Sequence, residues 1–573
     1  MSDGMKRRDF LTVVGVAGAG MAASACANPH TRQENFLASV RPSEDIVPGV
    51  PTWYTTTCRE CPAGCGLHVE THEGRATKVE GNPNHPINHG NTCPRGQASV
   101  QGLYHPDRHK GPFIRELTVG GAQRDISWTV AQSEVAEAIR AAGAGGTVLL
   151  TGSMGPTMTR LADEFTRAIG GRRVQWSLLE DAPRDLVFSD ADVLVSFGAD
   201  FLETWGSPVD YSYQFAEMHS YRKGRERAGK FIWVGPHRPL TGLNADLWLD
   251  AKPGTEALVA QALAGGVDAA TAAREAGIEP AKLQRAMQWW NEGRRKVAMG
   301  PGSMVAGPNA AVLRQAVARL NGTPAAPTAV SDLRPVQQLV ADMNAGRVKV
   351  LLIGGDSNPL YTLPGGVGFE AALKKVRTVV SFSPFTNDTS AAATHVLPDH
   401  HFLEAWDDYE GRPGVLELVQ PVMRPVFNSK QTGDVLLGIA SALGVRVAGV
   451  SAPAPAAGGA AAAAPAATGS IASAVVATTY FDYLRAAWAG RAGSVDAWRA
   501  ALRKGGVWGD LPSSTLRAAE GLVTPQAGDR AIPGGRATTN TGGVAAAGVG
   551  IAAPLAGPPQ AITPAPAGAV APV

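Results

Sequence analysis

The chain has 573 residues, of which 44% are hydrophobic and 18% are charged, and its formal net charge is +2. This length is too great for one ordinary domain, and the nearly balanced charge gives no sign of nucleic-acid binding. Four of the five cysteines fall within residues 58–93. That clustering argues against an extracellular disulfide framework, whose cysteines are dispersed, and indicates a localised thiol site.

Residues 1–30 have the pattern of a targeting segment. Arg7 and Arg8 precede a weakly apolar, Gly/Ala-rich run over residues 10–25, which is typical of a twin-arginine export signal. An ordinary secretory signal is the alternative, and the run is too short for a secure membrane span. The segment closes with Ala-Ser-Ala-Cys, an imperfect lipoprotein cleavage site. Cys26 therefore either carries a lipid that tethers the protein to a membrane surface or is removed with the leader.

The cysteine spacing predicts a [4Fe–4S] cluster. The pattern is C-x2-C-x3-C followed, after 27 further residues, by a fourth cysteine. A cubane cluster needs four thiolates that converge on one small site, and three on one loop with a fourth from a distant loop meet that need. Gly64 and Gly66 permit a tight loop, while Pro62 and Pro94 stiffen the turns beside two ligands. The predicted ligands are Cys58, Cys61, Cys65 and Cys93.

A zinc ion is the first alternative for these cysteines. Structural zinc sites usually pair C-x2-C with a second such pair or with histidines, and His85 and His89 lie nearby. A disulfide fits less well, because C-x2-C-x3-C crowds three sulfurs together. The spacing favours the cluster over both alternatives.

The chain as a whole predicts an α/β fold with parallel sheets. Residues 52–118 alternate with period two and indicate a small β-rich domain. Over residues 119–450, short apolar runs alternate with stretches of helical periodicity such as Thr157–Ile169 and Thr255–Ala264, which is typical of buried parallel strands with crossover helices. The predicted strands are Thr147–Leu150, Asp192–Phe197, Lys230–Val234, Lys296–Met299, Val348–Ile353 and Thr378–Ser381.

The C-terminal part changes composition twice. Residues 451–479 are Ala/Pro/Gly-rich with almost no charge and predict a linker. Residues 480–525 begin with aromatic and aliphatic side chains at helical spacing, which predicts a helical segment that docks on the body or, alternatively, awaits a partner. Residues 526–573 are again Pro/Ala/Gly-rich and predict disorder.

Several stretches resemble one known family. The cysteine pattern, Gly74–Pro83, Cys93–Gly96 and Tyr104–Arg108 resemble the cluster domain that opens the molybdopterin (bis-guanine-dinucleotide) oxidoreductases. Ser196–Trp205 and Val396–Glu404 are similar to the large iron–sulfur subunit of alternative complex III and of related quinone reductase complexes. The resemblance covers roughly residues 36–510 and implies α/β domains of the molybdopterin oxidoreductase type, kept in that branch as a scaffold and generally without molybdenum. Many relatives in the branch have lost these cysteines, whereas this chain keeps all four.

The resemblance also implies loops that hold pterin dinucleotides. Each of these loops, taken alone, is better explained as a turn that ends a strand. The family usually has Lys where Arg95 stands and Asp-Pro-Arg where this chain has Gly-Pro-His at 235–237, and only Ser177 and Asp181 are candidate molybdenum ligands by residue type. These departures make a molybdenum–bis-MGD cofactor (MGD, molybdopterin guanine dinucleotide) doubtful. The implied cofactor-binding residues are Arg95, Gly198, Asp200, His237, Gly254, Thr255, Glu256 and Asn358.

A second polar cluster lies late in the chain. A set of histidines and carboxylates could bind a metal, although we favour a polar loop against the cluster domain or a partner subunit. The residues are His395, Asp399, His400, His401, Glu404, Asp407 and Asp408.

Taken with the resemblance, these features imply an iron–sulfur electron-transfer and scaffold subunit of a membrane-associated quinone oxidoreductase complex. The implied partners are a ferredoxin-like multi-cluster subunit and an integral membrane subunit that interacts with quinone, on the periplasmic side of the cytoplasmic membrane. The main alternative is a molybdenum enzyme acting on a small oxyanion or sulfur compound, and a cluster-free structural protein is the third. We expect no counterpart after Lys504 of the β-barrel domain that closes over the pterins in active members of the family.

Overall fold

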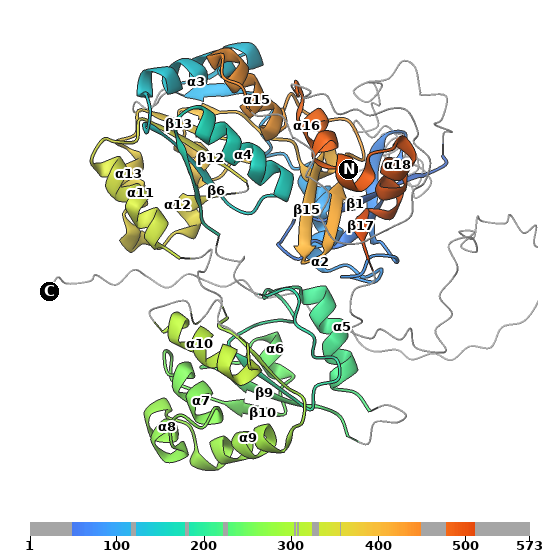
Figure 1. Cartoon of the computed structure of the whole chain (residues 1–573), viewed down its shortest axis with the longest axis vertical. Helices are drawn as coiled ribbons and strands as arrows, with labels where there is room; N and C mark the ends of the chain where they lie inside the picture. Colours follow the sequence, from blue (N-terminus) through green and yellow to red (C-terminus); the bar gives the residue numbers. More distant parts are fainter. Residues whose placement is uncertain are drawn as a thin grey trace, which may run out of the picture. The chain divides into compact units, whose positions relative to one another are not determined.

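The computed structural model describes residues 49–115, 122–177, 183–221, 227–302, 305, 309–323, 332–355, 357–447 and 477–509. These residues form a mixed α/β fold with four sheets (Figure 1). The leader with Cys26, the predicted linker up to residue 476, Asp181 and the predicted disordered tail lie outside the described residues. Among the residues described, no helix is long and apolar enough to cross a membrane.

The first sheet carries the cysteine loop. It is antiparallel, with strands β1 (Thr52–Thr57), β2 (Gly66–His72) and β3 (Arg75–Gly81) in that order, and helix α2 (Pro94–Leu103) follows. The register pairs Thr57 with Gly66, so that residues 58–65 form the connection between two paired strands. This connection contains three of the four clustered cysteines.

The second sheet is the largest and is parallel except at one edge. Strand β4 lies within the range predicted for the β-rich domain but pairs antiparallel with β14 of this sheet, and β5 extends it as an antiparallel edge. The order is β5 (Gln123–Asp125), β4 (Phe113–Arg115), β14 (His395–Val396), β13 (Thr378–Ser381), β12 (Val350–Gly354), β6 (Thr147–Thr151) and β7 (Arg172–Gln175).

Helices cover both faces of this sheet, because alternate strand residues point to opposite sides. Leu149 and Leu352 pack with one set of helices, α3 (Trp128–Ala142), α4 (Pro156–Ala168) and α15 (Thr432–Leu443). Leu150 and Leu351 pack on the other side with α11 (Arg334–Asn344) and α13 (Phe369–Leu373). Short elements complete this part: α12 (Pro359–Thr362), η4 (Gly365–Val367), α14 (Asp388–Ala391) and η5 (Phe402–Glu404).

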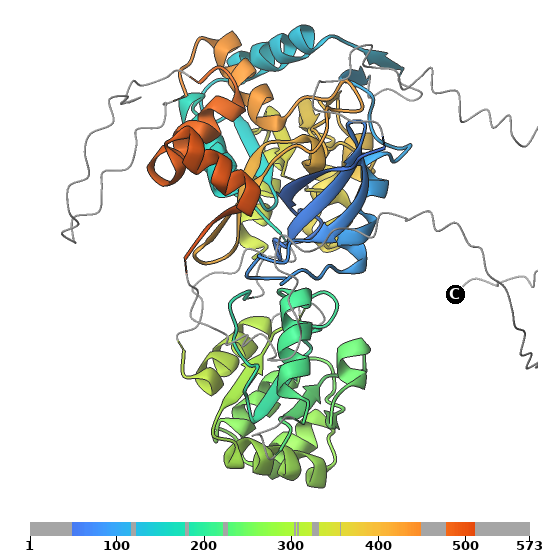
Figure 2. The same cartoon turned by 90° about the vertical axis from the view of Figure 1, so that its right-hand side faces the viewer.

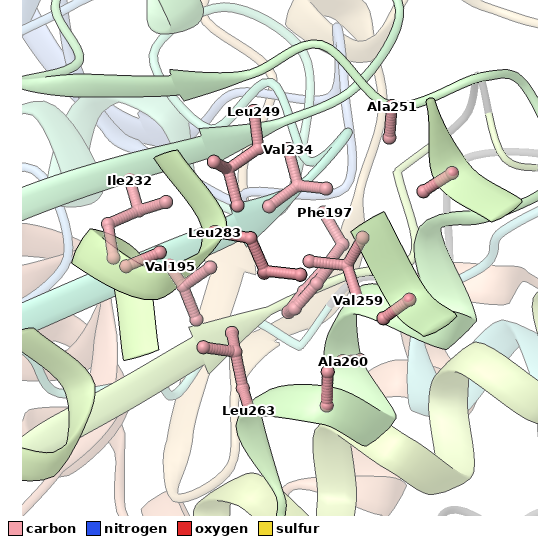
Figure 3. Close-up of a cluster of buried hydrophobic side chains, with 14 of the residues drawn as sticks. Val195, Phe197, Ile232, Val234, Leu249, Ala251, Val259, Ala260, Leu263 and Leu283 are labelled. Carbon is pink, nitrogen blue, oxygen red and sulfur yellow. The ribbon is translucent and has the colours of Figure 1, made fainter. Parts of the chain in front are cut away.

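The third sheet is fully parallel and lies in the central part of the sequence (Figure 2). Val195 and Phe197 of β8 enter one buried cluster with Ile232 and Leu283 (Figure 3), while Leu194 enters the cluster on the opposite face. The strand order is β10 (Leu247–Leu249), β9 (Lys230–Val234), β8 (Val193–Phe197) and β11 (Lys296–Met299). The helices are α5 (Pro208–Met218), α6 (Leu240–Leu243), α7 (Glu256–Leu263), α8 (Ala269–Ala276), α9 (Pro280–Glu292) and α10 (Ala310–Asn321).

The fourth sheet joins a hairpin to the C-terminal helical segment. Strands β15 (Asp407–Arg412) and β16 (Val415–Val419) pair antiparallel, and β17 (Gly506–Trp508) adds to β16. Helices α16 (Tyr480–Ala487), α17 (Ala489–Ala492) and α18 (Val495–Lys504) pack on it through Leu484, Trp488 and Trp498. The segment thus contacts the body rather than standing alone.

The predicted strands agree closely with the observed ones, and β9, β11 and β13 have the predicted bounds. The sequence did not predict β4, β5, β7, β10, β14 or the β15–β16–β17 sheet. Most of these are two to four residues long or carry charged residues, so that no apolar run announces them.

Candidate iron–sulfur site

The fold brings the four clustered cysteines together from two segments. The backbone N–H of Cys58 donates to the carbonyl of Cys65 at 2.8 Å and closes the loop, while Cys93 is the N-cap residue of α2. Cys58 and Cys65 are buried, whereas Cys61 and Cys93 are half-buried. The thiols are close enough that charges on Cys61 and Cys93 would raise the pKa of Cys58 and Cys65.

The environment of these thiols suits a bound cation. Burial is the main cause that raises the pKa of Cys58, Cys61 and Cys65, and it is opposed at Cys61 by the positive charges of Arg95 and Arg59. Buried thiols of this kind stay protonated unless a metal binds, and a coordinating thiol is then deprotonated. The donor set therefore fits an iron–sulfur cluster on chemical grounds.

The β15–β16 hairpin, more than 300 residues away in sequence, covers the loop. Gly64 has φ +65°, and a Cβ placed there would lie 2.7 Å from Oε2 of Glu417, 2.8 Å from Cα of Gly411 and 2.9 Å from Cδ1 of Tyr409. Gly64 is thus required both by its backbone conformation and by close packing. The sequence indicated the first reason but not the hairpin that supplies the second.

An arginine and a tyrosine from outside the loop bind it, and an arginine of the loop contacts the same tyrosine. Nη1 of Arg184 donates to the carbonyl oxygen of Pro62 and to Oη of Tyr409, both at 2.7 Å. The Tyr409 hydroxyl donates to the same carbonyl at 2.9 Å. The Arg59 guanidinium lies 3.7 Å from the centre of the Tyr409 ring, which is a cation–π contact.

The histidines considered as zinc ligands have other neighbours. Nε2 of His85 lies 3.1 Å from Oε1 of Glu417, both side chains are fully buried, and burial lowers the pKa of His85 to about 3. His89 packs against the ring of Tyr213. Among the described residues, no three His, Cys, Asp or Glu side chains converge closely enough for one metal ion. A cubane needs no such convergence, because each thiolate binds a different iron.

A cavity of about 300 Å³ lies beside the loop, at the carboxyl edge of the largest sheet. Residues after β6, β12 and β13 line it, as expected for a ligand site in a parallel sheet. Arg59 and Glu60 of the cysteine loop form part of its wall, so the cavity and the loop are neighbours. In the sequence, glycines mark only two of these strand ends, with Gly152 after β6 and Gly355 after β12.

Comparison with known proteins bears on this geometry. A family model described as the molybdopterin oxidoreductase Fe4S4 domain matches residues 51–105, which contain all four clustered cysteines. This chain carries a molybdopterin oxidoreductase Fe4S4 domain. The match supports a [4Fe–4S] cluster in the protein and confirms the resemblance inferred from the sequence.

The Fe4S4 domain and the rest of the chain have relatives among characterised proteins. The chain is 26% identical over 509 residues to the menaquinone reductase, molybdopterin-binding-like subunit of Nitratidesulfovibrio vulgaris, covering 77% of this chain and 72% of that protein. It is 26% identical over 250 residues to the molybdopterin-containing subunit of the arsenate respiratory reductase of Shewanella sp., covering 38% and 27%. Acetylene hydratase from Pelobacter acetylenicus superimposes with a TM-score of 0.56 at 14% identity, over 68% of this chain and 69% of that chain, which establishes the α/β fold.

Among the residues implied for pterin binding, Arg95 lies in the Fe4S4 domain and the others lie after strands of two sheets. The Arg95 guanidinium donates to the carbonyl of Glu203 at 3.2 Å, which ties the domain to the turn after β8. Gly198 begins that turn with φ +66°, and the Asp200 carboxylate accepts from the hydroxyl of Thr241. The His237 carbonyl accepts from Nε1 of Trp233 at 2.7 Å.

Most of the other implied residues are held by hydrogen bonds within the chain. The Gly254 carbonyl accepts from Nδ2 of Asn309 at 2.7 Å, and the Thr255 hydroxyl donates to the Lys252 carbonyl at 2.6 Å. Asn358 follows β12 of the largest sheet, and its Oδ1 accepts from the Thr389 hydroxyl at 2.7 Å. Glu256 differs, because Oε2 of this buried side chain has no hydrogen-bond partner among the residues that the structure describes.

One strand end is closed to an anionic ligand. The N-terminus of α4 follows β6, which is where a parallel sheet commonly binds phosphate. Here Oδ1 of Asp408 accepts from the backbone N–H of Thr157 at 2.9 Å, and Oδ2 accepts from the Thr157 hydroxyl and from Nε1 of Trp488. The chain's own carboxylate therefore takes this position, and a dinucleotide phosphate does not fit there.

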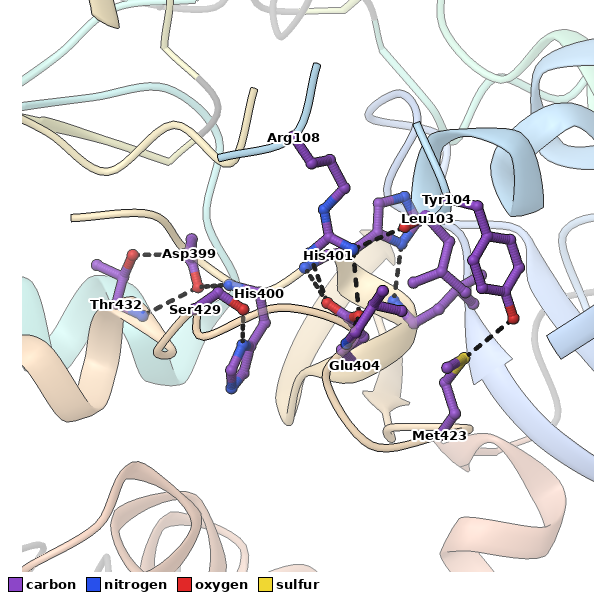
Figure 4. A network of polar contacts seen from close by, with 12 residues as sticks. Leu103, Tyr104, Arg108, Asp399, His400, His401, Glu404, Met423, Ser429 and Thr432 are labelled. Carbon is purple, nitrogen blue, oxygen red and sulfur yellow. Dashed lines mark hydrogen bonds and ion pairs between the residues drawn. The ribbon is translucent and has the colours of Figure 1, made fainter. Parts of the chain in front are cut away.

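The late polar cluster does not form a metal site in the described structure. Both nitrogens of the Arg108 fork donate to the Glu404 carboxylate, at 3.1 and 2.6 Å, in a fully buried pair (Figure 4). His401 is buried beside them, and burial lowers its pKa to about 3. His400 contacts the Ser429 hydroxyl at 2.7 Å. The cluster joins the segment after α2 to the large sheet, in line with the polar-loop interpretation.

Proposed function

We propose that this protein is an iron–sulfur electron-transfer and scaffold subunit of a membrane-associated quinone oxidoreductase complex. The observation that carries the proposal is the proximity of four thiols, whose charges would shift one another's pKa, within a matched Fe4S4 domain. Cys58, Cys61, Cys65 and Cys93 would hold the cluster. When bound, a [4Fe–4S] cluster accepts and releases one electron, at a potential that its surroundings set.

The burial of the four thiols indicates on which side of the cluster electrons would be exchanged. Cys58 and Cys65 are buried in the apolar core of the domain, whereas Cys61 and Cys93 are partly exposed. Electrons would therefore enter and leave on the side of Cys61 and Cys93. The partners we propose are a ferredoxin-like multi-cluster subunit and an integral membrane subunit that interacts with quinone. Similarity to a subunit named for menaquinone reductase over 77% of the chain supports this assignment.

The place of action follows from the leader. Arg7 and Arg8 before the weakly apolar run support export by the twin-arginine pathway, which carries folded proteins. The protein would then receive its cluster before export and act on the periplasmic side of the cytoplasmic membrane. A lipid on Cys26 would add a surface anchor. Molybdenum is no part of the proposal, because Asp408 already occupies the α4 N-terminus and residues of the pterin-type turns already hydrogen-bond to other parts of the chain.

Metal analysis tests the proposal directly. The full chain is produced in a host with twin-arginine export and molybdenum cofactor synthesis and is purified without oxygen. We expect about four irons per chain, no molybdenum or tungsten, and an electron paramagnetic resonance signal on reduction. Cys93→Ser serves as the matched variant and should lose iron and signal. Zinc in place of iron would refute the cluster, and stoichiometric molybdenum would make the protein an enzyme.

A further inference from the structure

Hydrogen bonds among Pro62, Arg184 and Tyr409 fix the partly exposed side of the cysteine loop. The carbonyl oxygen of Pro62, the residue after Cys61, accepts from Nη1 of Arg184 at 2.7 Å and from the Tyr409 hydroxyl at 2.9 Å. Nη1 of Arg184 also reaches Oη of Tyr409 at 2.7 Å. Each of the three groups therefore contacts both of the others, which restricts its position.

These hydrogen bonds hold the permanent positive charge of Arg184 next to the loop. A guanidinium stays charged at every accessible pH, so its field does not depend on a protonation state. Tyr409 is 3% exposed and Arg184 is half-buried, which limits screening by salt and water. Burial raises the pKa of the neighbouring Glu417 well above its usual range, and the positive charges of Arg59 and Arg184 oppose this rise.

None of these residues belongs to the cysteine motif. Arg184 precedes β8 and Tyr409 lies in β15, so the two approach the loop from two further parts of the chain. The loop thus has contacts beyond those that a Fe4S4 motif specifies by sequence. A protein sets the reduction potential of its cluster through contacts of this kind, which carry charge and fix a backbone carbonyl.

We propose that Arg184, held by Tyr409, is a positioning residue that raises the reduction potential of the cluster. Reduction adds one negative charge to the cluster, and a nearby fixed cation stabilises the reduced form more than the oxidised form. Arg184 adds this effect beside Cys61, on the side where the proposed function places electron exchange. The inference rests on the proposed function, because it requires the cluster to be bound.

A redox titration of three variants tests the inference. The full chain is purified without oxygen, and the reduced-cluster signal is followed by electron paramagnetic resonance against applied potential. Arg184→Gln should lower the midpoint by about 59 mV, a tenfold change in the equilibrium constant of a one-electron couple. Arg184→Lys keeps the charge and should retain most of the parent potential. Arg274→Gln removes an exposed arginine from α8 and should change nothing.

The outcomes separate charge from structure. The inference would be overturned if Arg184→Gln bound four irons and had the same midpoint potential as the parent. It would also be overturned if the midpoint potential fell equally in Arg184→Lys and Arg184→Gln. If Arg184→Gln fails to fold, Tyr409→Phe replaces it, because the loss of the hydroxyl removes one hydrogen bond of Arg184 without removing a charge. The midpoint potential of Tyr409→Phe should fall by less than about 59 mV, and an unchanged midpoint would refute the proposal. Absence of iron from the parent protein is a different result, which refutes the proposed function instead.

Discussion

Asp407 offers a test of how the cavity beside the cysteine loop handles charge. Its carboxylate accepts from the Tyr480 hydroxyl at 2.6 Å and lines the cavity with Arg59. Burial and the neighbouring Asp408 together raise the pKa of Asp407 to about 7, although the Tyr480 hydroxyl and the Arg59 charge oppose the rise. Asp407→Asn keeps an oxygen for the Tyr480 hydroxyl while removing the ionisation.

The sign of the effect follows from linkage. The folded protein holds this proton more tightly than the unfolded chain, whose Asp titrates near pH 3.9. The parent is therefore most stable below the unfolded pKa and loses stability as the pH rises toward the folded pKa near 7. From pH 5 to pH 7 lie two units, each worth about 1.36 kcal/mol, or about 3 kcal/mol in all. Because the carboxyl faces a cavity that water can enter, we expect about 1 to 3 kcal/mol.

The assay compares the two proteins at several pH values. Urea unfolding is followed by tryptophan fluorescence, and the quantity of interest is the stability of Asp407→Asn minus that of the parent. This difference should become more favourable to the variant by about 1 to 3 kcal/mol between pH 5 and pH 7 and then level off. Any intrinsic effect of asparagine cancels in the change with pH. A difference that is constant over this range would show that Asp407 titrates normally and would refute the reasoning.

Three further predictions concern packing and buried polar pairs. Glu404→Gln should destabilise the protein by about 3 to 5 kcal/mol in denaturant unfolding, because the buried Arg108 charge loses its partner, whereas Glu370→Gln in the exposed pair with Lys374 should have no measurable effect. Gly64→Ala should abolish iron loading, because the added Cβ would collide with the β15–β16 hairpin. The control Gly368→Ala also has a positive φ of +72° but open space around it, so it should keep its full iron content and lose about 1 kcal/mol of stability. Equal iron content in the two variants would contradict the packing argument. Trp488→Phe should cost about 1 to 3 kcal/mol by removing the indole donor to Asp408, and a shift no larger than that of Trp53→Phe, at a residue 41% exposed, would refute this.

The sequence predicted most of the buried parallel strands and the cysteine set for a common reason. Strands such as β9 and β13 are buried on both faces, so their apolar runs appear directly in the sequence. The spacing of the first three cysteines is equally local, because the register of Thr57 with Gly66 needs only the residues between two paired strands. Short or charged strands such as β4 and β14 gave no such signal, since their stability comes from neighbours in the sheet.

The sequence by itself determined the fold class, the cysteine loop and the resemblance to the molybdopterin oxidoreductases. The tertiary structure alone decided what surrounds that loop: the hairpin over Gly64, the Arg184–Tyr409 contact with Pro62, and the Asp408 carboxylate at the N-terminus of α4. Each of these contacts joins residues more than 100 positions apart. No local pattern encodes such pairs, because they depend on how separately formed sheets pack against one another.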